Sequence, residues 1–300
     1  MCQVCIDPVS GAQGIDFCHC GAPRTQAAVR RIEADLDRRR LIGGAGAALG
    51  LFAGFGLGGA DVRAQTDRPL LLTNLRLFDG NDLRLREGVD VMVQGARIAA
   101  LPQAGQGPED AERIDCGGRV VIPGLIDCHW HSTLVAVGMA AALTADIGFV
   151  HLAAGRQAGA TLLRGFTTVR DVGGPAFGLK TAIDARVIPG PRIFPSGAMI
   201  SQTGGHGDFR LLSDLPRTPG DRAGPTEAAG VAAIADGEAE VLRRAREQLM
   251  RGASQIKIMA GGGVSSLYDP LDGVQFSEAE MRAAVGAAED WGTYVCAHVY

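Results

Sequence analysis

The chain has little lysine, few aromatic residues and no marked excess of either charge. Only Lys180 and Lys257 occur among 29 basic residues, aromatic residues make up 5% of the 300 residues, and the formal net charge is −4. No basic run occurs after residue 64, so nucleic acid is not an expected partner. Hydrophobic residues at 46% and charged residues at 21% are typical of a globular chain. Together these proportions favour an enzyme that acts on small molecules.

The first 64 residues have the composition of an export signal. Residues 37–42 contain three consecutive arginines, residues 43–60 are rich in glycine and alanine, and residues 62–64 end on the small residue Ala64. An arginine pair before Leu41-Ile42 resembles the twin-arginine motif. We therefore expect export by the twin-arginine machinery, cleavage after Ala64, and a periplasmic or secreted protein. A membrane anchor is less favoured, because the apolar part is short and interrupted by glycine.

Thiols are concentrated ahead of this signal. The cluster comprises Cys2, Cys5, Cys18, His19 and Cys20. Thiolates at these spacings can close a tetrahedral zinc site, although cleavage would remove them from the mature protein. Either a transient metal or redox role, or a misplaced start codon, would explain why a cleaved segment carries this cluster. Elsewhere, Cys116, Cys128 and Cys296 are expected to be buried small hydrophobic residues, and no disulfide framework is expected.

Two patterns of secondary structure follow the signal. Short strands are predicted at residues 70–78, 89–93 and 97–101, as an antiparallel unit. From residue 120 onward, strands alternate with helices, which is typical of a parallel α/β arrangement. The predicted strands end near residues 131, 170, 195, 259 and 298, and the predicted helices lie near residues 139–160, 175–188, 236–251 and 277–292. Five such steps indicate a TIM-type barrel, whose active site gathers at the carboxyl ends of the strands.

Two local signals refine this organisation. Ser277 and Glu280 form a capping box that predicts the start of the last helix. Residues 201–230 are rich in glycine and proline, and are predicted to form a loop or lid over the site.

The apolar run of residues 120–131 ends in His129 and His131, which are separated by one residue. Alternation along a strand points both side chains to the same face, where two imidazoles can bind one metal ion. The alternative is one core histidine and one surface histidine. The apolar strand ahead of the pair favours the metal site.

Lys257 lies between Ile256 and Ile258 in a predicted strand, in a chain that otherwise uses arginine. Burial lowers the pKa of a lysine and favours a neutral amine, which arginine cannot supply. Such an amine can react with carbon dioxide to form a carbamate that bridges two metal ions. An ion pair, or an ammonium at the barrel mouth, explains the lysine equally well. His298 ends the fifth strand, so three histidines are expected to face one cavity.

These motifs resemble the amidohydrolase superfamily. Its pattern is His-x-His after barrel strand one, a carboxylated lysine after strand four, and a histidine after strand five. The resemblance covers residues 70–300, including the phrase at 121–127. Motifs at residues 165–174, 190–193, 201–208 and 255–263 resemble the branch that contains Xaa-Pro/Xaa-Arg dipeptidases and imidazolonepropionase.

The resemblance implies a β-sandwich part at residues 65–119 and a partial TIM-type barrel at residues 120–300. It also implies a centre of two divalent metal ions, with zinc the expected metal. His129 and His131 would hold the first ion, Lys257 as carbamate would bridge, and His298 would bind the second. A bridging hydroxide would then attack the amide of a small peptide or amide substrate.

Further site residues are carried over from the same branch. Tyr300 resembles a position that contacts the substrate carboxylate, and His206 is expected either to do likewise, to donate to the oxyanion, or to be a solvent-exposed loop histidine. Arg170 and Asp171 would orient substrate, brace the metal shell, or form a structural ion pair. His151 is expected to be a packing or surface residue.

The chain also departs from the family pattern. The family needs a histidine after strand six and an aspartate after strand eight, and both would lie beyond Tyr300. We therefore expect a partial reading frame, and a 300-residue polypeptide that is not a competent hydrolase alone. The leading hypothesis is an exported metal-dependent hydrolase of amide or peptide bonds, similar to a dipeptidase or carboxypeptidase. The alternatives are a cyclic amidohydrolase or deaminase of the imidazolonepropionase type, and a non-catalytic metal-binding remnant.

Overall fold

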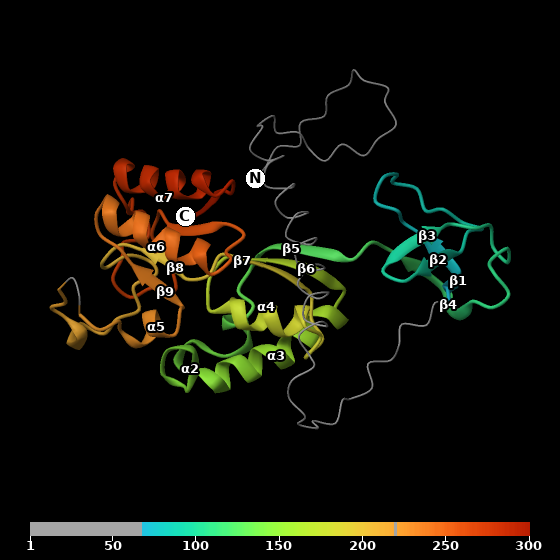
Figure 1. Ribbon diagram of the computed structural model, residues 1–300, viewed down its shortest axis with the longest axis horizontal. Coiled ribbons are helices and arrows are strands. Elements are labelled where there is room, and N and C mark those ends of the chain that lie inside the picture. Colours follow the sequence, from blue (N-terminus) through green and yellow to red (C-terminus); the bar gives the residue numbers. More distant parts are fainter. Residues whose placement is uncertain (1–67, 219–220) are drawn as a thin grey trace, which may run out of the picture. The chain divides into compact units, whose positions relative to one another are not determined.

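The computed structural model describes residues 68–218 and 221–300 (Figure 1). These residues fall into two compact units, residues 68–125 and residues 126–300. The predicted export signal, including its cleavage point at Ala64, lies outside the described residues. So does the cluster of Cys2, Cys5, Cys18, His19 and Cys20.

The first unit is a single mixed sheet. It contains β1 (Leu70–Leu77), β2 (Val91–Gln94), β3 (Arg97–Ala100) and β4 (Glu112–Val121), in the order β3-β2-β1-β4. β1 pairs antiparallel with β2 and parallel with β4, so the predicted antiparallel unit gains a parallel strand. Leu75, Leu77 and Val91 form its small buried core. Within residues 68–125 the expected sandwich is therefore represented by one layer.

The apolar run of residues 120–131 is divided between two strands, and not one strand as predicted. Val120 and Val121 end β4, where they pair with Arg76 and Leu77 of β1. β5 (Leu125–Trp130) belongs to a different sheet. Pro123 and Gly124 separate the two strands, because proline has no N–H to donate to a ladder and glycine disfavours extended structure. The boundary between the compact units follows Leu125.

The second unit contains two parallel sheets. The first has the order β5-β6-β7, with β6 (Phe166–Asp171) parallel to β7 (Arg192–Pro195). The second has the order β11-β10-β8-β9, and its pairs are all parallel. Its strands are β8 (Met199–Ser201), β9 (Ala232–Ile234), β10 (Ile256–Met259) and β11 (Val295–His298). The strand predicted to end near residue 195 is β7, and only residues 196–198 separate it from β8, which the sequence did not predict and which belongs to the second sheet.

Helices connect these strands, as the α/β pattern predicts. They are η1 (Leu134–Ala136), α2 (Met139–Thr144), α3 (Ile147–Leu163), α4 (Ala176–Asp184), η2 (Leu212–Asp214), α5 (Pro225–Ala228), α6 (Glu238–Met250) and α7 (Glu278–Asp290). The helix predicted near residues 139–160 is two helices, and Asp146 begins the second by accepting a hydrogen bond from the N–H of Gly148. None of the helices in the described part of the chain is both long and apolar enough to cross a bilayer.

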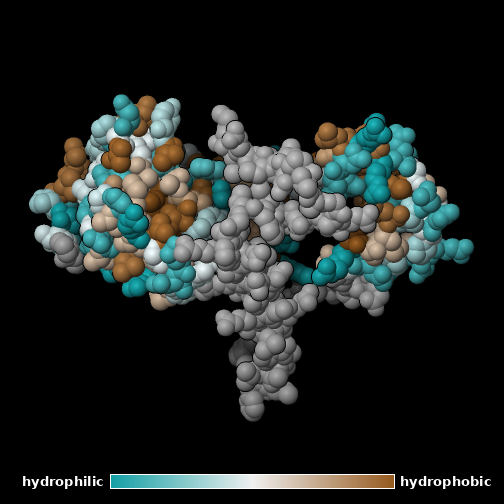
Figure 2. Space-filling model, turned by 90° about the horizontal axis from the view of Figure 1, so that it is seen from above, coloured by the Kyte–Doolittle hydropathy of each residue, from teal (hydrophilic) through white to brown (hydrophobic). Residues whose placement is uncertain are grey.

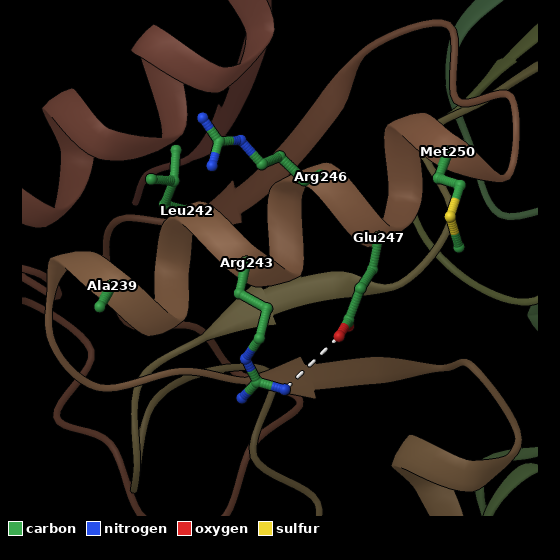
Figure 3. A pocket seen from close by; sticks show the side chains of 6 residues that line it. All are labelled: Ala239, Leu242, Arg243, Arg246, Glu247 and Met250. Atoms are coloured by element: carbon green, nitrogen blue, oxygen red, sulfur yellow. Dashed lines mark hydrogen bonds and ion pairs between the residues drawn. The ribbon is translucent and has the colours of Figure 1, made fainter.

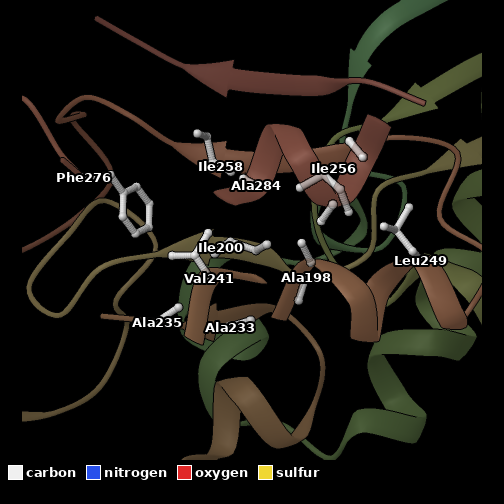
Figure 4. Packing of buried hydrophobic residues seen from close by; sticks show 13 residues of the cluster. Ala198, Ile200, Ala233, Ala235, Val241, Leu249, Ile256, Ile258, Phe276 and Ala284 are labelled. Carbon is white, nitrogen blue, oxygen red and sulfur yellow. The ribbon is translucent and has the colours of Figure 1, made fainter. Parts of the chain in front are cut away.

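The main hydrophobic core lies between α6, α7 and the strands β8 and β10 (Figure 4). All four residues of β10 are buried, as expected for a strand of a parallel sheet that is covered on both faces. The core residues labelled in Figure 4 are Ala198, Ile200, Ala233, Ala235, Val241, Leu249, Ile256, Ile258, Phe276 and Ala284. This packing fixes β10, which carries Lys257.

The segment predicted as a loop or lid at residues 201–230 has little regular structure between β8 and α5, apart from the short η2. Its first part packs inward, and Ser201, His206, Asp208 and Arg210 are buried. Two sequence expectations about burial are wrong, and the first is that of His206 as a solvent-exposed loop histidine. Cys128 is exposed, and Cys116 and Cys296 are only partly buried. The surface itself is mixed, with apolar patches between polar ones on the face shown in Figure 2.

The predicted capping box is confirmed and offers a test of local stability. The Ser277 hydroxyl accepts from the N–H of Glu280, whose carboxylate accepts from the N–H of Ser277. Replacing Ser277 by alanine leaves an N–H of the first turn without its partner, so we expect a loss of about 1 kcal/mol in the free energy of unfolding. Urea denaturation measures this loss. Ser277→Thr is the control and should lose much less, because threonine keeps the hydroxyl.

Candidate functional site

Lys257 is buried at the centre of β10. Its side chain is 2% exposed, its strand neighbours Ile256 and Ile258 belong to the hydrophobic core, and it lies in register with Cys296 of β11. Burial is the main cause that lowers the pKa of Lys257; the Cys296 thiol raises it and the Arg170 charge lowers it. Within the described residues no carboxylate forms an ion pair with this lysine. The ion-pair explanation for Lys257 is therefore not supported there.

His129 and His131 lie together where β5 ends. Their ring centroids are 5.7 Å apart. Nδ1 of His131 lies 3.0 Å from the carbonyl oxygen of Gly173, and a carbonyl can only accept, so Nδ1 carries the hydrogen. In the neutral ring the lone pair is then on Nε2. Metal-binding histidines commonly donate their other N–H to a carbonyl in this way.

His298 at the end of β11 is held by the same kind of contact. Its Nε2 lies 3.0 Å from the carbonyl oxygen of Gly262, which leaves the lone pair of the neutral ring on Nδ1. The ring stacks on that of His206, with centroids 4.2 Å apart and an interplanar angle of 17°.

The predicted ligands are within electrostatic reach of one another. Burial is the largest cause that lowers the pKa of His129, His131 and His206, and the charges of Lys257 and His298 lower all three further. Lys257 and His298 lie on the neighbouring strands β10 and β11, and His129 and His131 lie where β5 of the other sheet ends.

The donor chemistry of this region fits a cation, although the residues do not form a closed site. His131 and His298 each offer an unprotonated nitrogen, and Lys257 offers an amine whose charged form is disfavoured. In the part of the chain that the structure describes, no three His, Cys, Asp or Glu side chains are grouped closely enough to hold a metal ion.

Asp171 braces the backbone around His131. Its carboxylate is fully buried and accepts from the N–H of Ser132 at 2.6 Å and from the N–H of Gly173 at 3.1 Å. Burial raises the pKa of Asp171 to about 7, and these hydrogen bonds oppose that rise. Both N–H groups belong to residues that position His131, since Ser132 follows it and Gly173 binds its Nδ1.

Arg170 has protein partners other than Asp171. Its Nε donates to the carbonyl oxygen of Cys128 at 2.7 Å, and its Nη1 donates to the phenol of Tyr294 at 3.4 Å. No carboxylate pairs with it among the described residues, so the expected alternative of an ion pair with Asp171 is wrong. Arg170 instead links β6 to β5 and to the residue that precedes β11.

Other residues singled out in the sequence lie in different settings. Tyr300 follows β11, is 77% exposed, and forms no hydrogen bond or ring contact with the histidines of the described residues. His151 lies in α3 and lines a cavity of about 600 Å³ with Pro175 and Arg251, which agrees with a packing or surface role. A second, smaller cavity lies on α6 and is lined by Leu242, Met250 and the Arg243–Glu247 ion pair (Figure 3). Neither cavity includes the predicted ligands.

Glycines allow the loop after β10 to pass close to the site. A Cβ on Gly262 would collide with the backbone carbonyls of Pro270 and Leu271, and one on Gly263 would collide with the His206 ring. The glycine run at residues 261–263 is thus required for close approach.

Three side chains around His206 had no sequence signal. Gln275 accepts a hydrogen bond from the backbone N–H of His206 at 2.9 Å, Ser266 Oγ lies 2.7 Å from its Nδ1, and Asp269 Oδ2 lies 3.7 Å from the same nitrogen. These residues are about 60 positions away along the chain, so no local motif connects them to His206.

Comparisons with known proteins agree with these features. The family model described as "Amidohydrolase family" matches residues 120–300. The chain is 36% identical to an ochratoxinase of Aspergillus niger over 194 residues, which cover 60% of this chain and 39% of that protein.

Solved structures extend the similarity. A prolidase in complex with N-methylphosphonate-L-proline is 38% identical, with a TM-score of 0.68 over 77% of this chain and 56% of that one. A Xaa-Pro dipeptidase with bound methionine is 29% identical, with a TM-score of 0.64 and the same coverage. The chain thus spans 39% of the curated relative and 56% of each solved structure.

The buried amine of Lys257 predicts a pH dependence of stability. Because its pKa is lower in the fold than the ordinary lysine value of 10.5, the unfolded chain binds more protons between the two values. The free energy of unfolding therefore rises with pH across that window, and this gain is lost as pH falls. Lys257→Met removes the pH dependence that the amine causes. We expect the difference in unfolding free energy between wild type and Lys257→Met to change with alkaline pH, in carbon dioxide-free buffer.

Urea titrations of both proteins measure this difference. Lys180→Met, which changes a lysine of α4 that is paired with Asp184, is the matched control. A difference that does not vary with pH would contradict the expected low pKa of Lys257.

Proposed function

Because the chain belongs to the amidohydrolase family, we propose that it contributes to a metal-dependent hydrolase of amide or peptide C–N bonds in small substrates. One observation carries the proposal. His129 and His131 lie at the end of β5 with ring centroids 5.7 Å apart, and buried Lys257 lies beside the strand that ends in His298. A metal-dependent site requires that such nitrogen ligands converge on one region.

The role proposed for each residue follows from the donor atoms that it offers. His131 and His298 would present Nε2 and Nδ1 to divalent cations, for which zinc is the expected metal, and His129 would complete the first pair. The neutral amine of Lys257 would attack the carbon of carbon dioxide and release a proton to solvent, which gives an anionic carbamate with two oxygen donors. When bound, the cations activate water and polarise the scissile carbonyl.

The substrate would be recognised through a free carboxylate. His206 is buried next to His298, so it would meet the part of the substrate near the reacting bond, and Tyr300 would make a contact from the exposed end of the chain. Arg170, with its donors directed to Cys128 and Tyr294, would support the strands beneath the substrate. The similar prolidase and dipeptidase structures hold ligands of the amino-acid type, which supports a small carboxylate substrate.

A substrate screen tests the reaction class. The protein, expressed from the longest in-frame sequence of its gene and supplied with zinc, is assayed with Xaa-Pro and Xaa-Arg dipeptides, N-acyl amino acids and cyclic amides. We expect hydrolysis of the linear amides. Activity confined to cyclic amides would refute the peptidase-like function and favour a cyclic amidohydrolase.

Substitution of one ligand separates metal binding from folding. Loss of a residue that only supports a metal ligand typically lowers metal affinity or activity about 10- to 100-fold. His131→Ala removes a ligand itself, so it should reduce zinc content and turnover by more than that. His151→Ala, in α3, is the matched control and should leave both unchanged. Elemental analysis and initial rates provide the measurements, and equal zinc content in the two variants would contradict the assignment.

We also propose that the twin-arginine machinery exports this protein, on the basis of residues 37–64. Replacing Arg38 and Arg39 together by lysine should leave the chain uncleaved in the cytoplasm. Fractionation and blotting of cells that express both forms measure this. Normal cleavage of the double variant would exclude the twin-arginine route.

A further inference from the structure

His206 is enclosed by protein on most of its surface. The ring of His298 stacks on it, and the backbone of Gly263 lies so close to its ring that no Cβ would fit there. Its backbone N–H is held by Gln275. For a histidine held by these contacts, the chemistry that the ring offers depends on which ring nitrogen carries hydrogen.

Ser266 determines that choice. Its hydroxyl donates to the carbonyl oxygen of Gly263 at 3.0 Å, and a hydroxyl has only one hydrogen to donate. When that hydrogen is directed to Gly263, the contact of 2.7 Å between Ser266 Oγ and His206 Nδ1 has the histidine as donor. Nδ1 then carries the hydrogen, whether the ring is neutral or charged.

Asp269 reinforces the same orientation. Its side chain is 2% exposed, and its Oδ2 lies 3.7 Å from His206 Nδ1 while accepting from the N–H of Gly263 and from Gln275 Nε2. Its Oδ1 is buried without a hydrogen-bond partner in the described residues. A buried carboxylate beside Nδ1 favours a hydrogen on that nitrogen, because it attracts the positive end of the N–H dipole.

The other ring nitrogen is much less engaged. Nε2 has one long contact, 3.4 Å to Ser265 Oγ. We propose that Ser266 and Asp269 are positioning residues that hold the hydrogen of His206 on Nδ1 and keep Nε2 available to the substrate. This inference rests on the proposed function, in which His206 meets the substrate.

The arrangement has a chemical consequence. A neutral His206 would accept a hydrogen bond or a proton at Nε2, and it could donate there only after gaining a proton. The substrate group opposite Nε2 in the neutral enzyme is therefore a hydrogen-bond donor, such as an amide N–H, whereas a carboxylate would require the charged ring.

Nitrogen-15 NMR tests the tautomer directly. The full chain is labelled with ¹⁵N-histidine, and ring nitrogens are correlated with ring carbon-bound protons at alkaline pH, where histidine rings are neutral. His206→Gln assigns the signal. We expect a protonated Nδ1 and an unprotonated Nε2 for His206. A hydrogen on Nε2 in the wild-type chain would overturn the proposal.

Variants identify the residues responsible. Ser266→Ala and Asp269→Asn should each shift the ring towards the form with hydrogen on Nε2, whereas Ser266→Thr keeps a hydroxyl and should restore the wild-type spectrum. Ser265→Ala is the matched control and should change nothing at Nδ1. Spectra of Ser266→Ala and Asp269→Asn that are identical to wild type would also overturn the proposal.

The same spectra show whether a variant is folded. They also separate the proposed positioning of His206 from the proposed hydrolysis. The Nδ1 signal of His131, held by the Gly173 carbonyl, shows that a variant remains folded. The tautomer is observed without turnover, so failure of hydrolysis and failure of positioning give different results. Turnover is assayed on the protein expressed from the longest in-frame sequence of the gene. Absence of hydrolysis there, with hydrogen on Nδ1 of His206, would remove the proposed reaction, and hydrolysis with hydrogen on Nε2 would remove the positioning role.

Discussion

The burial of Lys257 in β10 is the constraint on which the site depends. All four residues of the strand are buried, and both flanking isoleucines belong to the core beneath α6 and α7. Removing an ammonium from water is costly, so this position favours a neutral or modified amine. Arginine would stay charged there, which gives a physical reason for lysine in a chain that is otherwise rich in arginine. The core that stabilises β10 therefore also lowers the pKa of the Lys257 amine.

Strands alone do not orient the histidines, because the loops that follow them supply the acceptors. Gly173 follows β6 and receives the hydrogen of His131, whereas Gly262 follows β10 and receives that of His298. Each acceptor is a glycine carbonyl, in a loop where side chains would collide with neighbouring groups. Glycine in these loops therefore helps to orient the histidine rings, since it allows the backbone to approach an imidazole closely.

Local patterns predicted much of this arrangement. Periodicity and capping identified most strands of the second unit and the start of α7 at Ser277. Lys257 and His298 lie on the neighbouring parallel strands β10 and β11, whereas His129 lies on β5 of the other sheet, so their convergence on one site stays a prediction. Short elements such as β8 and β9, with three residues each, were missed because they are too short to show a period. The burial of His206 was also missed, since it depends on Gln275 and Ser266, which are distant in sequence.

The two buried carboxylates near the site, Asp171 and Asp269, differ in how many of their oxygens accept hydrogen bonds. Asp171 accepts from backbone N–H groups on both oxygens, so its hydrogen-bonding capacity is used to hold the chain around His131. Asp269 satisfies only Oδ2 among the described residues, and that oxygen also faces a histidine. Buried polar atoms are nearly always paired, so an unsatisfied one requires a reason. Bracing of the backbone explains Asp171 fully, whereas Asp269 places its Oδ2 near His206 and leaves its buried Oδ1 without a hydrogen-bond partner among the described residues.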